Sequence, residues 1–358
     1  MHPSEWFAMR GHPPVCCGAG LVALDIILDD NEDSKVTPQS ATGGSCGNVL
    51  TMLAYLGWSS YPIARLADDP ASSEIIFDLQ RWNVNVKMVE RSKDGSTPII
   101  VQRITVNRSG LPHHHFEWNC PLCGADLPRY KPVLVREIER ISIATPTPQV
   151  FFFDRAVPSS VELARHYKEK GALIVFEPSA IRDEKLFNAS LHLADVLKYS
   201  NDRMGNFHEM MQGYAVPLEI ETLGSEGLRY RRCHQPWKPL PVVPIEKLID
   251  SAGAGDWCTA GLIHLLGRQG QKGFSKKTDS EFETALKFGQ TCAAINCQYA
   301  GARGCMYNLP KSSFEAQVKQ RLAGNNAMLP LKDNALQGPI EGLRRVCPAC
   351  VEKKRLNN

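Results

Sequence analysis

The sequence predicts an α/β protein whose mostly parallel central sheet is covered by helices on both faces. The middle of the chain gives the clearest evidence, because an apolar strand at 149–154, a helix at 161–170 and a second apolar strand at 172–177 follow one another. Short apolar strands separated by helices are typical of parallel sheets. A second observation is that two small-residue turns, at 43–44 and 251–255, each lead directly into an apolar helix. Ligands bind such folds at the carboxyl ends of the strands.

The N-terminal half predicts further strands and a helix. Residues 15–29 are expected to form one strand that leads into a second, and Asp25 lies among the apolar residues of the second strand. A lone buried carboxylate is unfavourable, so we expect Asp25 to contact a partner; the alternative is an edge strand on which it faces water. A helix is predicted at 72–82, followed by a strand of alternating polarity at 98–105.

The C-terminal half continues the alternation, with strands predicted at 193–199 and 216–222. A turn that contains Thr222, Gly224 and Gly227 follows the second of these strands, and by itself it could be any β-turn. Because the turn follows a strand, we expect it at the carboxyl edge of the sheet.

Length and composition indicate a globular protein of one or two domains. The chain has 358 residues, of which 43% are hydrophobic and 22% charged, as is ordinary for a soluble protein. A formal net charge of +3 does not indicate a nucleic-acid partner, and no long apolar run indicates a membrane partner. Residues 1–13 are expected to form a loose tail rather than a secretory signal, which predicts a cytoplasmic protein.

The most informative segment is Asp250-Ser-Ala-Gly-Ala-Gly-Asp256, which precedes an apolar helix at 257–266. A small-residue turn at the start of a helix directs backbone N–H groups outward at the positive end of the helix dipole, and so favours anions. A carboxylate beside an anion site needs a reason. Asp256 would suit a general base that takes a proton from a hydroxyl attacking a phosphoryl group. The alternative is an N-cap aspartate on an ordinary turn.

A second segment, residues 43–57, begins with the pair Gly43-Gly44, carries Asn48 in the first turns of a predicted helix and ends at Gly57. An asparagine side chain both donates and accepts hydrogen bonds and therefore suits a sugar hydroxyl. Many helices start this way, so the segment is a weak signal by itself.

Together the two segments resemble the ribokinase family of sugar and nucleoside kinases, also called the PfkB family. Its first motif has a glycine pair, an asparagine four residues later and a helix that ends in Leu-Gly, here Leu56-Gly57. Its second motif reads Asp-Thr-x-Gly-Ala-Gly-Asp, which residues 250–256 match with Ser251 in place of threonine. The order and spacing of the motifs also agree, and the resemblance extends from about residue 14 to about residue 310.

The resemblance implies a ribokinase-like three-layer α/β/α core over residues 14–310, with a small β lid formed by strands at about 24–40 and 96–118. It also implies ATP-dependent transfer of the γ-phosphoryl group to a hydroxyl of a small sugar, with magnesium as cofactor. A homodimer paired through the lid is a further implication.

The site residues that the resemblance implies fall into four groups. The catalytic group contains the general base Asp256 and an anion hole at the turn of Gly253, Ala254, Gly255 and Asp256, in which the last three residues supply the N–H groups. The sugar-binding group contains Asp25, Gly43, Gly44 and Asn48. The nucleotide-binding group contains Thr222, Gly224, Gly227, Asn296 and Gly301. Asp250 would belong to a site for a monovalent cation such as potassium.

The segment after the strand at 193–199 departs from the family, which has an Asn-x-x-Glu pair there that helps to order magnesium and phosphate. Ser200 and Arg203 stand at those positions, and Asn201 and Asp202 could replace them with a shift. Arg203 could instead contact a phosphate. Two other functions therefore stay open: a nucleoside kinase of the same family, and a non-catalytic regulatory or binding protein with the same fold.

The segment 113–118 falls where the family has its lid. His113, His114 and His115 would either be exposed to solvent or contact the substrate. Phe116 and Trp118 would either stack on a nucleoside base or form the core of the lid, and both pairs of alternatives stay open.

Four of the twelve cysteines form two Cys-Pro-x-Cys pairs, Cys120 with Cys123 and Cys347 with Cys350. Each pair would place two thiolates on one side of a tight turn, and two such pairs make a tetrahedral structural zinc site. The alternatives are two independent reduced pairs or a redox-active pair. A shared zinc would fold the C-terminal extension, residues 311–358, back onto the turn at 120–123.

Overall fold

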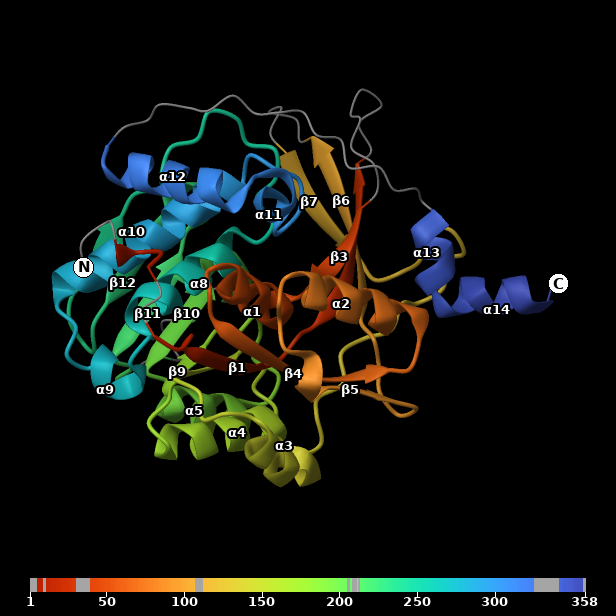
Figure 1. Ribbon diagram of the computed structural model, residues 1–358, viewed down its shortest axis with the longest axis horizontal. Helices are drawn as coiled ribbons and strands as arrows, with labels where there is room; N and C mark the ends of the chain where they lie inside the picture. Colours follow the sequence, from red (N-terminus) through yellow and green to blue (C-terminus); the bar gives the residue numbers. More distant parts are fainter. Residues whose placement is uncertain are drawn as a thin grey trace.

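A sheet of nine strands crosses the part of the chain that the computed structural model describes, namely residues 5–8, 11–29, 39–106, 112–204, 207, 211, 213–324 and 341–356 (Figure 1). The strand order is β13-β12-β11-β10-β9-β8-β1-β4-β5. The strands are β1 (Val15–Ala19), β4 (Ser59–Ala67), β5 (Val89–Ser92), β8 (Val150–Phe153), β9 (Leu173–Phe176), β10 (Val196–Ser200), β11 (Leu218–Thr222), β12 (Leu228–Arg231) and β13 (Lys238–Leu240). Neighbours from β11 to β5 run parallel, whereas β12 and β13 add antiparallel strands at one edge.

A second sheet of four described strands, called the small sheet below, has the order β3-β2-β6-β7. Its strands are β2 (Ala23–Asp29), β3 (Gln39–Gly43), β6 (Ile99–Val106) and β7 (Pro112–Glu117). The chain passes almost directly from β1, inside the large sheet, to β2, inside the small one. The predicted double strand over 15–29 is therefore split between two sheets, and the small sheet stands beside helices α1 and α2 (Figure 1).

Helices cover both faces of the large sheet. The described helices are α1 (Ser45–Tyr55), α2 (Pro70–Arg81), α3 (Ile138–Ala144), α4 (Pro158–Glu169), α5 (Glu184–Leu193), α6 (Asn201–Met204), α8 (Ala254–Leu266), α9 (Gly270–Phe274), α10 (Asp279–Asn296), α11 (Gly304–Asn308), α12 (Lys311–Leu322), α13 (Glu341–Val346) and α14 (Pro348–Leu356). One hydrophobic core contains side chains of α1, α2, α8, α10 and α12, and the other contains side chains of α3, α4 and α5. None of the described helices is long and apolar enough to span a membrane.

Strand β8 shows why the predicted strands are apolar throughout. Alternate residues of a strand point to opposite faces. Phe152 accordingly packs in the core with α1 and α8, whereas Phe151 and Phe153 pack in the core with α4 and α5. The predicted fold class is confirmed: an α/β/α core with a mostly parallel sheet and a small second sheet.

Strand and helix boundaries agree closely with the sequence-based expectations except before β10. The helix expected at 72–82 is α2, and it begins at Pro70 because Asp69 caps it and forms a capping box with Ser72. The strand expected at 193–199 begins only at Val196, because the preceding residues form α5.

The expectation of a loose tail over residues 1–13 is wrong for residues 5–8. Trp6 is 5% exposed and packs edge-on against Phe288 of α10. Its carbonyl oxygen accepts a hydrogen bond of 2.7 Å from Arg268 Nη2, and the carbonyl of Ala8 accepts one of 3.0 Å from Nη1 of the same residue. The packing of Trp6 on Phe288 and the two hydrogen bonds from Arg268 therefore fix this segment on the helical layer.

Candidate active site

Helix α8 begins at the turn that the sequence singled out. Gly253 is its N-cap and has a φ of 71°, and a Cβ added there would lie 2.4 Å from the carbonyl oxygen of Ala302. Glycine is therefore required at this position. Within the described residues, the N–H groups of Gly255 and Asp256 have no backbone partner, so both can donate to an anion. The N–H of Ala254 instead donates to Ser251 O at 3.2 Å, which corrects the expectation that Ala254 belongs to the anion hole.

The carboxylate of Asp256 meets the first motif directly. Asn48 Nδ2, from a buried position near the start of α1, donates a hydrogen bond of 2.8 Å to Asp256 Oδ2. Burial and the nearby charge of Glu177 raise the pKa of Asp256 to about 7, although Asn48 and two cationic side chains act in the opposite direction. A carboxyl group with this pKa exchanges a proton near neutral pH, as a general base must.

An ion pair lies beside the anion-binding turn. Lys198 of β10 pairs with Glu177 Oε1 at the end of β9, and the second oxygen of Glu177 accepts a hydrogen bond from Thr259 of α8. Burial lowers the pKa of Lys198, but the paired Glu177 outweighs it and holds the ammonium protonated. A Cβ added to Gly255 would lie 3.4 Å from Lys198 Nζ, so this positive charge flanks the turn. Sequence reasoning missed Lys198; a lysine inside an apolar strand was the available signal.

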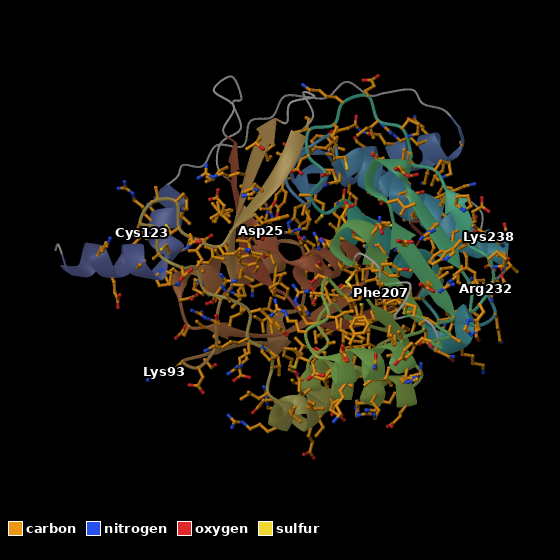
Figure 2. All side chains as sticks on the ribbon, turned by 180° about the vertical axis from the view of Figure 1, so that it is seen from behind. Asp25, Lys93, Cys123, Phe207, Arg232 and Lys238 are labelled. Atoms are coloured by element: carbon orange, nitrogen blue, oxygen red, sulfur yellow. The ribbon has the colours of Figure 1, made fainter. Side chains whose placement is uncertain are left out.

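Asp25 is buried in β2 and does not face water, so the edge-strand alternative is wrong. Figure 2 shows it at the base of the small sheet, where the strands meet the main body. Its Oδ2 accepts a hydrogen bond of 2.7 Å from Gln102 Nε2 of β6. Burial raises the pKa of Asp25 to about 7, with Asp256 adding to the effect and Arg303 opposing it.

The glycine pair makes room for these contacts. A Cβ added to Gly43 would lie 1.9 Å from the carboxyl carbon of Asp25. Gly44 has a φ of 75°, caps α1, and with a Cβ would approach Leu21 O to 2.4 Å. Both glycines therefore determine where Asp25 and Asn48 lie.

The residues expected around a nucleotide lie at the far ends of β11 and α10. Thr222 ends β11, and Gly224 and Gly227 form the tight turn into β12, with Gly227 at a φ of 95°. Gly301 also has a positive φ, 88°, and its N–H donates to Asp250 Oδ2 at 2.6 Å.

Asn296 is the exception among the expected nucleotide contacts. It is fully buried, and its Nδ2 donates to the carbonyls of Ala252 (3.3 Å) and Gly301 (3.1 Å), while its Oδ1 accepts from Cys305 N at 3.1 Å. Every hydrogen-bonding group of the side chain is engaged by the backbone. This corrects the expectation of a nucleotide contact: Asn296 fixes the turn before α8 to the loop at 301–305.

The divergent segment after β10 forms the short helix α6, in which Arg203 is exposed. Arg203 acts on the site through its charge, because it lowers the pKa of Asp256. Ser200 stands at the end of β10 and pairs with Thr222 across the sheet.

The histidines and aromatic residues of 112–118 lie on or just after β7. His115 is exposed, whereas the side chains of His113 and His114 lie outside the described residues. Trp118 packs against Leu21, Ala23 and Ile100, with the guanidinium of Arg129 5.4 Å from its ring centre. Trp118 is therefore partly buried against residues of the small sheet, and Phe116 is 44% exposed.

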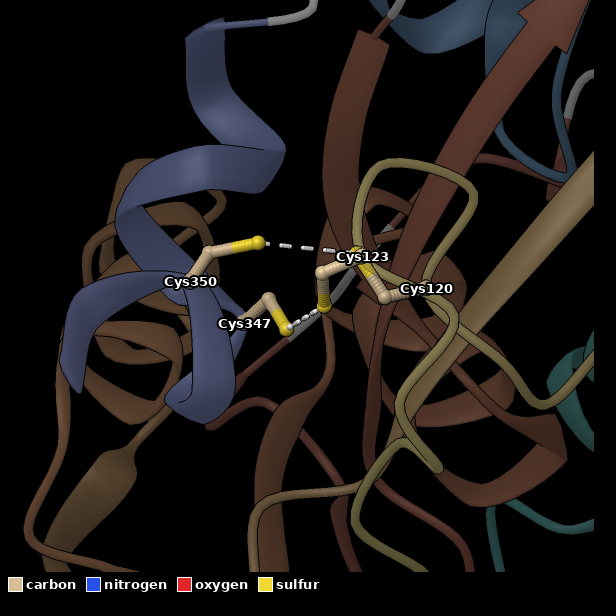
Figure 3. Close-up of side chains that lie close together, drawn as sticks. All are labelled: Cys120, Cys123, Cys347 and Cys350. Carbon is tan, nitrogen blue, oxygen red and sulfur yellow. Dashed lines mark hydrogen bonds between the residues drawn. The ribbon is translucent and has the colours of Figure 1, made fainter. Parts of the chain in front are cut away.

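The four paired cysteines come together although more than two hundred residues separate the pairs (Figure 3). Cys120 Sγ lies 3.8 Å from Cys350 Sγ, Cys123 Sγ lies 3.7 Å from Cys347 Sγ, and all four sulfur atoms lie within 4.8 Å of one another. A hydrogen bond from the backbone of Ala125 lowers the pKa of Cys123 to about 7. The cluster joins the turn after β7 to α13 and α14.

Comparison with known proteins finds similarity to sugar and nucleoside kinases. The model of the pfkB family carbohydrate kinases matches residues 207–309, which include the turn before α8. An ATP-dependent ribose-1-phosphate kinase of Halopiger xanaduensis is 25% identical over 300 residues, covering 80% of this chain and 92% of that protein.

Several solved structures share the fold. Aminoimidazole riboside kinase from Salmonella enterica, complexed with aminoimidazole riboside and an ATP analogue, has a TM-score of 0.63 at 18% identity, over 85% of this chain and 99% of that chain. Ribokinase from Arabidopsis thaliana, complexed with ribose and ATP, has a TM-score of 0.61 at 17% identity, over 86% and 99%. A nucleoside kinase from Burkholderia thailandensis, in complex with inosine, has a TM-score of 0.64 at 15% identity, over 86% and 98%. The chain therefore shares the ribokinase-like fold of these kinases, and its residues 207–309 match the pfkB family carbohydrate kinases.

Proposed function

We propose that this protein transfers the γ-phosphoryl group of ATP to a hydroxyl group of a small sugar, with Asp256 as the general base. The observation that carries the proposal is the position of Asp256. Its carboxylate lies at the N-terminus of α8, next to two unpartnered N–H groups, and contacts Asn48 of the glycine-pair motif. A base and an anion-binding turn at one point are what phosphoryl transfer to a hydroxyl requires.

The chemistry follows from the charges around the turn. Asp256 takes the proton of the acceptor hydroxyl while the hydroxyl oxygen attacks the γ-phosphorus. The bond from the γ-phosphorus to the β,γ-bridging oxygen breaks, and ADP leaves with that oxygen. The N–H groups of Gly255 and Asp256, the positive end of α8 and the ammonium of Lys198 stabilise the negative charge of the transferring group. Glu177 holds Lys198 in place and keeps it charged.

Magnesium and a monovalent cation complete the proposal. Magnesium would neutralise the phosphates of ATP, and we expect the phosphates and water to supply most of its ligands, because both oxygens of Glu177 are already engaged. Asp250 is fully buried and accepts from the N–H groups of Ala252 and Gly301. We expect its carboxylate to contribute to a potassium site beside the turn.

A sugar is the first choice of acceptor, and a nucleoside is the second. The riboside and nucleoside kinases among the similar structures favour the second choice. The packing of Trp118 against Leu21, Ala23 and Ile100 argues against it, because only part of this ring is left to stack on a base.

We further propose that Cys120, Cys123, Cys347 and Cys350 hold a structural zinc ion. In a tetrahedral site with Zn–S bonds of about 2.3 Å, neighbouring sulfur atoms lie about 3.8 Å apart. The Sγ–Sγ distances of 3.8 Å (Cys120 to Cys350) and 3.7 Å (Cys123 to Cys347) agree with this geometry and are far longer than a disulfide bond of about 2.05 Å. The ion would tie α13 and α14 to the turn after β7.

A direct assay tests the kinase proposal. The purified protein, with ATP and magnesium, is incubated with free sugars, sugar phosphates and nucleosides, and ADP release and phosphorylated product are measured. One strongly preferred sugar is the expected result, and a preferred nucleoside would establish the second choice. Binding of a sugar without product formation by the wild-type protein would contradict the kinase proposal and favour a regulatory protein with the kinase fold.

A further inference from the structure

A small cavity lies between the small sheet and α11, next to Asp25. Its volume is about 20 Å³, and its lining includes Asp25, Ile27, Thr42, Gly301, Arg303 and Tyr307. A cavity of this size holds one water-sized group.

Arg303 enters this cavity from a fixed position. Its side chain is 1% exposed, and its Nη2 donates to the carbonyl of Thr42 on β3 and to Asp78 Oδ2 of α2, the latter at 2.7 Å. Asp78 also accepts from Thr42 N and Tyr307 OH, each at 2.8 Å. The guanidinium is therefore neutralised by Asp78 and locked by three elements before any ligand arrives.

Three buried polar atoms at this place have no hydrogen-bond partner in the described part of the chain. They are Nη1 of Arg303, Oδ1 of Asp25 and Oε1 of Gln102. A buried donor or acceptor without a partner is unfavourable by about 1–3 kcal/mol, so such atoms indicate a ligand or a water. Arg303 and Asp25 line the cavity, and Gln102 is hydrogen-bonded to Asp25. The set contains one donor and two acceptors, and a hydroxyl group satisfies both kinds because it accepts and donates.

We infer that this cavity is a hydroxyl subsite, in which Arg303 Nη1 donates to the oxygen of one acceptor hydroxyl and Asp25 Oδ1 accepts its proton. The inference rests on the proposed kinase function and adds a residue that determines specificity. The hydroxyl seated here is not the one that is phosphorylated, because Asp256 serves that one. The buried carboxylate of Asp25 disfavours an anionic substituent at this point.

The test uses substrate and protein variants together. The wild-type protein and the variant Arg303→Lys are compared with the best sugar of the acceptor panel and with each of its monodeoxy derivatives. Lysine keeps the charge opposite Asp78 but lacks the second nitrogen. Tyr307→Phe is the matched control, because it removes a hydrogen bond to Asp78 and leaves Nη1 in place.

For one monodeoxy derivative, the kcat/KM of the wild-type protein should be about 10- to 150-fold lower than for the parent sugar. This is the range expected for a hydrogen bond to a charged group. With the parent sugar, the kcat/KM of Arg303→Lys should be lower than that of the wild type by a similar factor. Replacing the parent sugar with that derivative should then lower the kcat/KM of Arg303→Lys only slightly further, because both changes remove the same contact. Tyr307→Phe should lower the melting temperature and leave the ratio between parent sugar and derivative unchanged.

Equal discrimination by wild type and Arg303→Lys would overturn the subsite and leave a cavity that holds a structural water. If no sugar is phosphorylated, calorimetric binding of D-ribose and its monodeoxy derivatives makes the same comparison. A discriminating derivative then supports the subsite while the kinase proposal fails, and equal binding of all derivatives overturns the subsite. Nucleotide affinity and circular dichroism show that each variant is folded.

Discussion

Asn48 and Asp256, 208 positions apart in the chain, are joined by a hydrogen bond of 2.8 Å from Nδ2 to Oδ2. The bond brings the start of α1 and the start of α8 to one point. Each helix is capped by a glycine at positive φ, Gly44 for α1 and Gly253 for α8. Neither cap position has room for a residue with a Cβ. The amide orients the carboxylate that we propose as the base.

Asp256→Asn should lower kcat by about 10² to 10⁴, because proton transfer in the transition state is lost. The amide is isosteric and no longer has to be charged in a buried position, so the melting temperature should stay equal or rise. Kinetics with the preferred acceptor and calorimetry with an ATP analogue measure the two effects. Near-normal turnover in this variant would remove Asp256 from the role of base.

The acid limb of the pH profile of kcat/KM should report the ionisation of Asp256 and its shift by Glu177. Asp256 acts when ionised and its pKa is raised to about 7, so kcat/KM should rise with pH through about 7 and then level off. Glu177→Gln removes a neighbouring negative charge and frees Lys198, and both changes favour the ionised carboxylate. The limb should therefore move to lower pH. A limb that stays in place or moves to higher pH would contradict the assignment.

Alanine substitutions at the two glycines of the turn should both lower activity but differ in their effect on stability. Gly253→Ala forces a left-handed backbone on alanine, at about 1–2 kcal/mol, and adds a contact of 2.4 Å with Ala302 O. It should lower the melting temperature and the activity together. Gly255→Ala makes only ordinary contacts, so stability should be retained while kcat falls, because the methyl group lies where the phosphoryl group approaches. Thermal denaturation and kinetics of the pair separate structure from chemistry.

The four-cysteine cluster should contain one zinc ion per chain, measured by elemental analysis. Chelation or Cys120→Ser should remove the ion, lower the melting temperature and make α13 and α14 susceptible to protease. Cys233→Ser is the control, because Cys233 is exposed and lies outside the cluster. Full zinc content in the Cys120→Ser variant would show that the ion, if bound, is held elsewhere.

Trp6→Ala should destabilise the protein by about 3–5 kcal/mol, the usual range for removing a buried aromatic side chain. Trp6 packs on α10 and lies outside the proposed site, so kcat and KM should not change. Urea denaturation measures the first effect and steady-state kinetics the second. A stability unchanged by the substitution would mean that residues 5–8 contribute nothing to the folded state.

The sequence predicted the elements of the large sheet because its strands are buried on both faces. An apolar run such as Phe151–Phe153 can be recognised as a buried strand without knowing which strands lie beside it. It also predicted the turn at 250–256 and the glycine pair, because glycine at such positions indicates a backbone conformation that other residues rarely adopt. The expectations for Ala254, Asn296 and the N-terminal tail failed because each depends on which distant atom completes a hydrogen bond or a packing contact.

By itself, then, the sequence determined the fold class, the two motifs, the pairing of the cysteines into two turns and the family that these features indicate. Only the tertiary structure decided that Asn48 meets Asp256, that Lys198 flanks the anion-binding turn and that Arg303 presents one nitrogen to a cavity beside Asp25. Local patterns record what a residue requires of its own backbone and solvent exposure. The charge and hydrogen-bond partners of a site come from segments far apart in the chain, and their meeting depends on how the whole sheet is ordered.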